Sequence, residues 1–388
     1  MAVYKEHGLR ENISTNGIFL GVLVVALAPI IFKVLGLHDN FSSVLCTVFT
    51  TGVLGLCYLT YGKKFVSSSF MWLLVINAGS LVISIVLNGS GLGVAAIHIN
   101  TLLIVNILNN TTFKKEQVCL VHLLVGLYLL FWVMSLDTRL IWRSYVCDPD
   151  GQYVNPCTLA IITLASYYHL FAFADLVIKR FWMKMLLIVP LSAWALYYIY
   201  ISVCRTSLLA LFAFWAFCVM KRPVLGNYRK ITVLLISLAF IFPAIYIVLY
   251  NTMDDWNLFG ESFFTGRQVV WPSTFENILD NAFFGAGSES TIELRHGLMD
   301  DAHNLILGVW KNIGIIPVIS LFVIFLRGNN IRWISINNQR TKIMFLTCFI
   351  VSIAETLLNS SEFYMFFIPL LMTIRSDNHE KRKNRFIG

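Results

Sequence analysis

The stretch that decides the fold runs from residue 184 to residue 222: KMLLIVPLSAWALYYIYISVCRTSLLALFAFWAFCVMKR. It has basic residues at both ends and a single internal arginine, Arg205. The apolar run is too long for one bilayer crossing, which takes about 20 residues. Because Lys and Arg gather on the cytoplasmic side of membrane proteins, basic groups at both ends require an even number of crossings. The stretch therefore predicts two spans, 183–202 and 206–220, with an outer turn near Cys204 and Arg205.

Apolar runs recur along the whole chain of 388 residues, which is 57% hydrophobic and only 13% charged. Its mean hydropathy of +0.73 is far above that of soluble domains. We therefore expect an all-α, polytopic membrane protein of about 12 transmembrane helices, with 1–388 forming a single integral membrane domain. Mostly polar residues precede the first run, so that run should act as its own uncleaved insertion signal. The predicted spans are 17–37, 41–61, 69–87, 94–112, 118–136, 157–178, 183–202, 206–220, 231–250, 303–326, 343–358 and 362–374.

The basic residues fall in every second gap between these runs. Under one assignment, 22 of the 29 Lys and Arg lie on the same side, which predicts that both termini are cytoplasmic. The net charge of +8 is then a topology signal, and no nucleic-acid partner is expected. The same assignment places 137–156 and 251–302 outside, as the second and the main outer loop, and makes 375–388 a basic cytoplasmic tail.

Seven basic residues break this rule: Lys33, Arg139, Arg143, Arg205, Arg267, Arg295 and Lys311. A cation at an outer helix end is not needed for orientation and is a candidate functional group, the alternative being snorkelling to lipid headgroups. Arg205 lies in a tight turn with little room for water, which favours a buried anionic partner. For Arg295 a solvated loop face is the favoured interpretation, while Arg139 and Arg143 could bind a glycan or headgroups.

Arg267 and Trp271 lie four residues apart in FFTGRQVVWP and would be neighbours on a helix. The apolar stripe Trp271, Phe275, Ile278 and Leu279 predicts a short interfacial helix over 271–280. A lone arginine over such a helix suits a phosphate at the bilayer surface, because its guanidinium can bind two oxygens at once.

The sequence MDDAHNLILGVWKNIGIIP, residues 299–317, brings Asp300, Asp301, His303 and Asn304 to the outer mouth of the tenth span. If Asp301 caps this helix, His303 lies in its first turn, where the helix dipole disfavours the imidazolium. A neutral imidazole there could accept a proton, and Asp300 could orient it. The alternatives are a capping box with a solvated histidine, and a metal site made of Asp300, Asp301 and His303, which no second cluster completes.

Other polar groups fall inside or at the ends of predicted spans. Those inside could line a cavity or bond between helices: His98, Asn100, Asn106, His122, His169 and Asp175. Glu355, Asn359 and Glu362 gather at the outer end of the last two spans, on the side of His303. Glu355 is therefore counted among the site candidates. Cys147 and Cys157 flank one outer loop and could form a disulfide.

Three segments, in order along 205–317, resemble one family. CRTSLLAL resembles its (S/T)-R-(T/G)-x-L-L motif, and TGRQVVW followed by ILDNAFFGAG resembles its G-R-x-x-x-W … P-x-x-G-x-G segment. AHNLILGVWKNIGIIP resembles its H-N-x-(Y/F)-L … G-(I/L)-(I/L)-G element. The family is the O-antigen ligase/polymerase superfamily, bacterial inner-membrane enzymes that move glycans from undecaprenyl diphosphate on the periplasmic face. The usual proline is missing from 281–284, and Pro317 stands where a second glycine is common.

This resemblance implies an inverting glycosyl transfer that needs neither a nucleotide sugar nor a metal or other cofactor. It makes the outer loops periplasmic, with Arg205 and Arg267 holding the diphosphate and His303 receiving the acceptor proton or orienting the acceptor. The expected substrate-binding residues are Trp271, Asp300, Asp301, Asn304, Arg295 and Glu355. The expected partners are an undecaprenyl-diphosphate-linked oligosaccharide and membrane lipid, with a chain-length regulator protein as an optional one. O-antigen polymerase is the favoured activity; ligation to lipid A core and transport of a lipid-linked oligosaccharide are the alternatives.

Overall fold

In the computed structural model the chain is almost entirely helical, as its composition predicts. The structure describes residues 2–34, 40–62, 66–88, 92–136, 146–147, 153–154, 156–252, 257–258, 261–262, 267–287, 292–294, 297–299, 302–327, 339–353 and 362–374. Its helices are α1 (Ala2–Val34), α2 (Asn40–Tyr61), α3 (Ser68–Asn88), α4 (Leu92–Asn110), α5 (Lys115–Ser135), α6 (Pro156–Val177), α7 (Phe181–Ile201), α8 (Arg205–Val219), α9 (Lys221–Gly226), α10 (Tyr228–Thr252), α11 (Arg267–Asp280), α12 (Leu305–Ile313), α13 (Ile315–Arg327), α14 (Gln339–Ser352) and α15 (Glu362–Leu371).

Seven stretches of the described helices are long and apolar enough to cross a membrane: Val44–Tyr61, Ser68–Asn88, Leu92–Asn110, Lys115–Ser135, Pro156–Val177, Phe181–Ile201 and Tyr228–Tyr250. Three shorter apolar stretches are Asn16–Phe32, Arg205–Val219 and Ile315–Leu326. The outer face of α7 is strongly apolar, since Trp182 and Leu186 are 81% and 78% exposed. Side chains of this kind suit contact with lipid, and the helices together suit an all-α protein embedded in a membrane.

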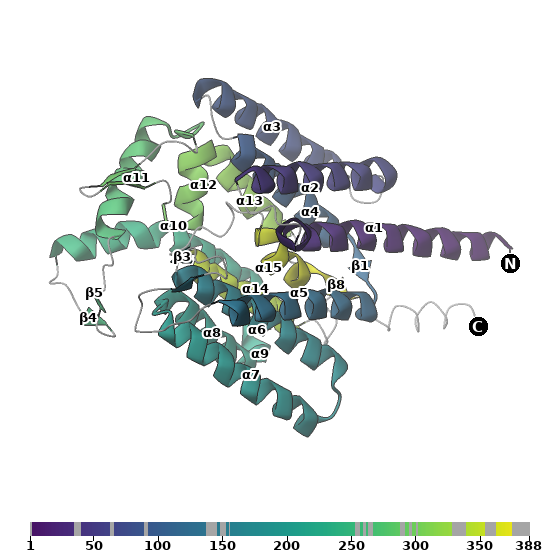
Figure 1. Cartoon of the computed structure of the whole chain (residues 1–388). Coiled ribbons are helices and arrows are strands. Elements are labelled where there is room, and N and C mark those ends of the chain that lie inside the picture. Colours follow the sequence, from purple (N-terminus) through teal and green to yellow (C-terminus); the bar gives the residue numbers. More distant parts are fainter. Residues whose placement is uncertain are drawn as a thin grey trace.

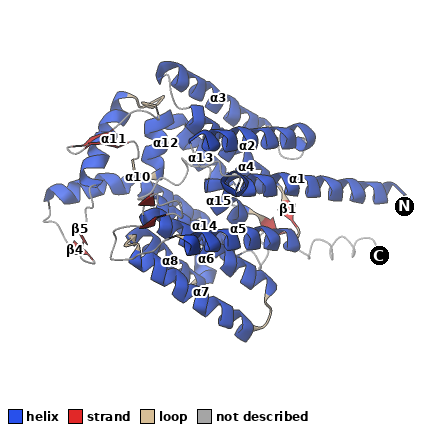
Figure 2. Cartoon of the chain, viewed as in Figure 1, coloured by secondary structure: helices blue, strands red, loops and turns tan. Residues whose placement is uncertain are grey.

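The strands are short and lie in the connections between helices, as Figure 2 shows. Four pairs are described: β1 (Thr112–Phe113) with β8 (Thr373–Ile374), β2 (Val146–Cys147) with β3 (Tyr153–Val154), β4 (Asn257–Leu258) with β5 (Glu261–Ser262), and β6 (Ile292–Leu294) with β7 (Gly297–Met299). The start of α1 and the parallel β1–β8 pair lie at one end of the bundle, and α11 with β4 and β5 lies at the other (Figure 1). The two ends of the molecule are thus built from different parts of the chain.

Buried polar groups join neighbouring helices, one of the two roles expected for them. His122 of α5 and His169 of α6 are fully buried, with their Nδ1 atoms 3.1 Å apart. Asn100 of α4 donates to Thr51 of α2, and Asn106 of α4 donates to Tyr58 of α2. Each bond satisfies a group that would be costly to bury alone, so these residues fix helix pairs in register.

The predicted tenth span, 303–326, is two helices in the structure. Helix α12 ends at Ile313, and Gly314 takes φ +91° before α13 begins. A side chain at Gly314 would overlap the carbonyl oxygen of Phe283, so only glycine fits this close approach. The apolar run alone gives no sign of the break, because the hydrophobic residues of α12 and α13 join into one stretch long enough for a single span.

Candidate functional site

Helix α12 starts at the first residue after Asn304, and this corrects the expected cap. The Asn304 Oδ1 accepts hydrogen bonds from the backbone N–H groups of Ile306 and Leu307, at 2.9 and 3.0 Å. Asn304 is therefore the N-cap, in extended conformation, and the prediction that Asp301 caps the helix is wrong. His303 consequently precedes the cap and does not lie in the first turn. It still lies beside the positive end of the α12 dipole.

His303 has an unusual backbone conformation for a residue with a side chain. Its φ is +46°, in the left-handed region that residues other than glycine rarely occupy. Such a residue costs about 1–2 kcal/mol and persists only where its neighbours hold it. Both neighbours are buried here, since Ala302 is 1% exposed and Asn304 is 0% exposed.

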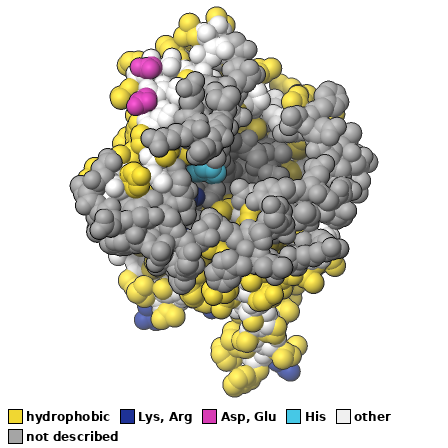
Figure 3. All heavy atoms as spheres, turned by 60° about the vertical axis from the view of Figure 1, so that its left-hand side comes forward, with side chains coloured by type: hydrophobic (Ala, Val, Ile, Leu, Met, Phe, Trp, Pro, Cys, Tyr) yellow, Lys and Arg dark blue, Asp and Glu magenta, His cyan; other side chains and the backbone are white. Residues whose placement is uncertain are grey.

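The imidazole of His303 is only partly buried, unlike the other histidines whose exposure the structure describes. His98, His122 and His169 are at most 5% exposed. Figure 3 looks onto the end of the molecule that carries α11, and a histidine side chain is visible on this face. An imidazole in this position can exchange a proton with a bound molecule, whereas the three buried ones cannot.

Helix α11 holds the residue before His303. The Trp271 Nε1 donates a hydrogen bond of 2.9 Å to the carbonyl oxygen of Ala302. The Trp271 ring is fully buried and packs edge-on against Tyr246 of α10, with ring centroids 4.7 Å apart. Arg267 is the first residue of α11, one turn before Trp271, so this helix connects the arginine to the turn at His303.

The predicted helix over 271–280 is present, but it begins four residues earlier than expected. Its buried residues include Trp271 and Ile278, as the stripe predicts, whereas Leu279 is 77% exposed and Phe275 is only partly buried. Thr274, which does not belong to the predicted apolar stripe, is buried instead. The apolar face turns toward α10 and α12 because Trp271 and Ile278 join a small core there with Tyr246 and Leu307.

The segment after α11 fixes the far end of α12. Trp310 Nε1 donates to the carbonyl of Ala282 at 2.8 Å, and the Ala286 N–H donates to the carbonyl of Lys311 at 2.6 Å. Gly285, at φ +73°, lies so close to the end of α12 that a side chain there would overlap the backbone at Asn312 and Ile313. The sequence AFFGAG, singled out by resemblance, thus anchors the helix that follows His303.

Arg205 reaches the same end of the molecule as His303, which follows from contacts deeper in the bundle. The Tyr168 hydroxyl bonds both the Ala210 carbonyl of α8, at 3.3 Å, and the Thr347 hydroxyl of α14, at 2.7 Å. Ala210 and Thr347 therefore lie at the same depth in the bundle. Helix α14 begins at the end of the bundle opposite to the candidate site, so it runs antiparallel to α8. Going toward the candidate site, α8 continues five residues to Arg205, about 7.5 Å, and α14 continues five residues to Ser352, which Ile353 follows. The Ile353 carbonyl accepts a hydrogen bond of 2.8 Å from Asn304 Nδ2.

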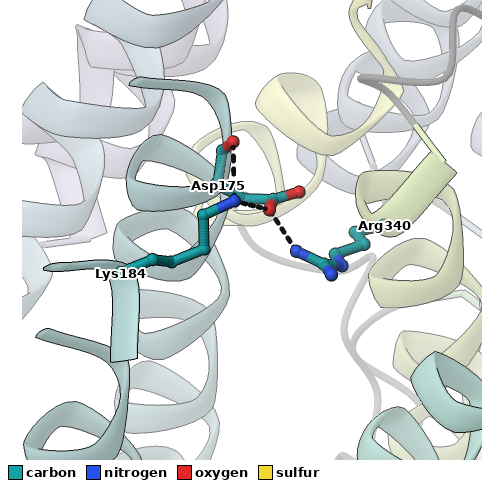
Figure 4. A network of polar contacts seen from close by, with 3 residues as sticks. All are labelled: Asp175, Lys184 and Arg340. Carbon is teal, nitrogen blue, oxygen red and sulfur yellow. Dashed lines mark hydrogen bonds and ion pairs between the residues drawn. The ribbon is translucent and has the colours of Figure 1, made fainter. Parts of the chain in front are cut away.

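An ion cluster marks the opposite end of the same helices. Asp175 of α6 pairs with Lys184 at 2.6 Å and with Arg340 at the start of α14 (Figure 4). The Arg340 guanidinium also lies 5.8 Å from the ring centroid of Phe171. Burial, and after it the charge of Arg340, lowers the pKa of Lys221, which begins α9. These charges are remote from His303 and stabilise the bundle; Asp175 has partners and is not an isolated intramembrane acid.

The two described non-glycine residues with positive φ are His303 and Val203, the latter at +55°. Val203 lies in the turn between α7 and α8, two residues before Arg205. A β-branched residue in this region is a genuine outlier. Strained backbone of this kind clusters at functional sites, and both instances adjoin residues of the candidate motifs. Nothing in the sequence around Val203 indicates it.

Several predicted site residues lie outside the described part of the chain: Arg295, Asp300, Asp301 and Glu355. The side chain of Cys147 does too, so its expected disulfide with Cys157 is not addressed. Within the described residues, no group of three or more His, Cys, Asp and Glu could hold a metal ion. Trp271 and Asn304, which are expected to bind substrate, are fully buried and hydrogen-bonded to the protein.

A small apolar pocket, with a volume of about 20 Å³, lies beside the first turn of α12. It is lined by residues of α10, α12, α13 and α14, among them Ala239, Leu305, Ile306 and Phe322. No protein-family model matches the chain, and no curated protein or solved structure matches it significantly.

Proposed function

We propose that the protein is a polymerase of lipid-linked polysaccharide repeat units, of the O-antigen polymerase type. It would lie in the inner membrane of a bacterium with about 12 crossings, both termini in the cytoplasm and 251–302 in the periplasm. The basic residues in alternate gaps support this topology. The positions of α11 at one end of the bundle and of the start of α1 at the other agree with it (Figure 1).

The observation that carries the proposal is the strained turn at His303, held between buried neighbours at the end of the molecule that Arg205 also reaches. Arg267 begins the helix whose Trp271 holds this turn. Two guanidinium groups and an imidazole are the groups needed to bind a diphosphate and accept a hydroxyl proton. An intramembrane transporter would instead carry its charged groups near the middle of the bilayer.

In the proposed reaction, the acceptor sugar hydroxyl attacks the anomeric carbon of the donor glycan from the face opposite the diphosphate. The new C–O bond forms as the bond to the diphosphate oxygen breaks, so the configuration inverts and undecaprenyl diphosphate leaves with the bonding electrons. The hydroxyl proton passes to His303. Arg205 and Arg267 stabilise the charge that develops on the leaving diphosphate. The helix α11 would lie at the membrane surface beside the diphosphate.

The test is a deletion of the gene in its bacterium, with lipopolysaccharide or capsule examined on a gel. A ladder that collapses to core plus one repeat unit supports polymerisation. Complete loss of O-antigen, with lipid-linked polymer accumulating, identifies a ligase that uses lipid A core as acceptor. An unchanged ladder overturns both assignments.

The proposed topology has its own measurement, a reporter fused to the chain. A reporter that is active only in the periplasm should be active when it is fused at residue 290. A reporter that is active only in the cytoplasm should be active when it is fused after residue 380. A cytoplasmic reporter at residue 290 would place the candidate site on the wrong side of the membrane for a lipid-linked periplasmic donor.

A further inference from the structure

Helix α10 contains a proline at position 243, and this leaves one of its carbonyl groups without a backbone donor. In an α-helix the N–H of residue 243 would bond the carbonyl of residue 239, but Pro243 has no N–H. The Ala239 carbonyl is also buried, since Ala239 is 1% exposed. An unsatisfied carbonyl in the apolar part of a membrane protein costs free energy, so another donor is needed there.

Asn304 supplies that donor. Its Nδ2 donates to the Ala239 carbonyl at 2.8 Å and, with its second hydrogen, to the Ile353 carbonyl at 2.8 Å. Ile353 directly follows the last residue of α14, where helix carbonyls also lack intrahelical donors. The Oδ1 of the same amide caps α12. One side chain thus satisfies two carbonyls of α10 and α14 and two N–H groups of α12.

We infer that Asn304 is a positioning residue, which locks the start of α12 to the Pro243 gap of α10 and the end of α14 and so holds His303 in its left-handed turn. It does not touch the substrate, and its role in the reaction rests on the proposed function of His303. This replaces the substrate-binding role expected of Asn304 from the sequence. Because the residue beside His303 is held by four hydrogen bonds, His303 cannot relax to an ordinary backbone conformation without breaking the junction.

Only asparagine meets these requirements at this position. Aspartate accepts two hydrogen bonds as well as asparagine does, but its ionised form donates none. Alanine loses both functions, and serine has one donor where two are used. Glutamine has the same amide on a side chain longer by one methylene, so the cap and both carbonyls cannot be reached from the same backbone.

The experiment is a double-mutant cycle of Asn304→Asp and Pro243→Ala in the purified full-length protein. Asn304→Asp should lower the unfolding temperature by about 3 °C or more and slow glycan transfer about tenfold or more. Pro243→Ala restores the N–H of residue 243, so the Ala239 carbonyl gains an intrahelical donor. In that background Asn304→Asp should cost clearly less in both measurements. The transfer assay uses lipid-linked repeat unit extracted from a strain that lacks the gene.

A pH profile separates the loss of a hydrogen-bond donor from general disruption. When the carboxyl group introduced by Asn304→Asp is protonated, it regains one donor. Transfer by this variant relative to wild type should therefore rise as the pH is lowered. A general packing defect gives a ratio that does not change with pH.

Each outcome decides a separate part of the inference. If Asn304→Asp lowers the unfolding temperature equally with and without Pro243, the junction with α10 is wrong. If the two changes are coupled in stability but Asn304→Asp transfers glycan at the wild-type rate, the positioning role is wrong and the junction stands. If the wild-type protein transfers nothing, the proposed function fails, and the stability cycle still tests the junction.

Discussion

The indole of Trp271 donates a hydrogen bond of 2.9 Å to the carbonyl oxygen of Ala302, the residue before His303. The donor lies on α11, which Arg267 begins, and the acceptor lies in the segment that leads into α12. This single bond connects two of the three segments that resemble the glycan-transfer family. It also fixes one of the two peptide groups that flank the strained residue.

Replacing Trp271 by phenylalanine should therefore impair the candidate site more than the fold. The ring would still pack against Tyr246, but the buried Ala302 carbonyl would lose its donor, at a cost of about 1–3 kcal/mol. We expect glycan transfer to fall at least about tenfold and the unfolding temperature to fall by a few degrees.

Trp310→Phe is a matched control for this change. It removes an indole donor to the Ala282 carbonyl at the far end of α12, while leaving the contacts around His303 in place. Equal losses of transfer in the two variants would show that Trp271 has no special relation to His303.

The break between α12 and α13 should depend on Gly314. Gly314→Ala places a methyl group against the carbonyl of Phe283 at φ +91°, so the helix pair must shift or unfold locally. We expect a loss of about 2–4 kcal/mol of stability, measured as a lower unfolding temperature and a lower yield of folded protein. Gly79→Ala in α3 is the control, because nothing lies within 4 Å of a side chain there. A normal unfolding temperature for Gly314→Ala would contradict the described close approach.

Arg267→Lys should be nearly as damaging to transfer as Arg267→Ala, if the guanidinium binds two phosphate oxygens. A lysine ammonium keeps the charge but cannot reproduce the two parallel hydrogen bonds. The measurement is the length of the glycan ladder in a deletion strain that carries each variant at matched protein level. A ladder of normal length from the lysine variant would reduce Arg267 to a source of positive charge.

The sequence predicts where the helices lie, because a bilayer demands about 20 apolar residues per crossing and the run boundaries are sharp. Each predicted run overlaps a described helix, and the chain turns between α7 and α8 just before Arg205, where a turn is predicted. The sequence does not predict the helix start at Asn304 or the break at Gly314. A cap is decided by which side chain can reach the free N–H groups, and three neighbouring residues of suitable type compete in DDAHN.

In the candidate site, too, some features can be predicted from the sequence and others cannot. The residue types at Arg205, Arg267 and His303 are visible in the sequence, because Arg205 and His303 are polar groups at the mouth of apolar runs and Arg267 precedes an amphipathic stripe. The burial of Trp271 and Asn304 is not visible in the sequence. The sequence favours both as residues that line the site, whereas both are fully buried. Their roles depend on acceptors far away in the chain, Ala302 for Trp271 and Ala239 and Ile353 for Asn304. The signal that points to one of them is Pro243, which indicates an unsatisfied carbonyl four residues earlier.

The strain at His303 makes its substitutions more informative than usual. His303→Ala removes the imidazole but leaves a side chain at φ +46°, whereas His303→Gly removes both the imidazole and the strain. If His303 accepts the proton, both variants should lose transfer by about 10²–10⁴-fold, which reads as no ladder. The glycine variant should nonetheless be the more stable of the two by about 1 kcal/mol, measured by thermal unfolding. The glycine variant then gains stability over the alanine variant without gaining activity, as expected when strain is kept for the sake of a functional group. His303→Gln keeps hydrogen bonding without basicity, so an active glutamine variant would mean that His303 orients the acceptor and another group takes the proton. A normal ladder from His303→Ala would show that the left-handed turn, and not the imidazole, is what the site requires.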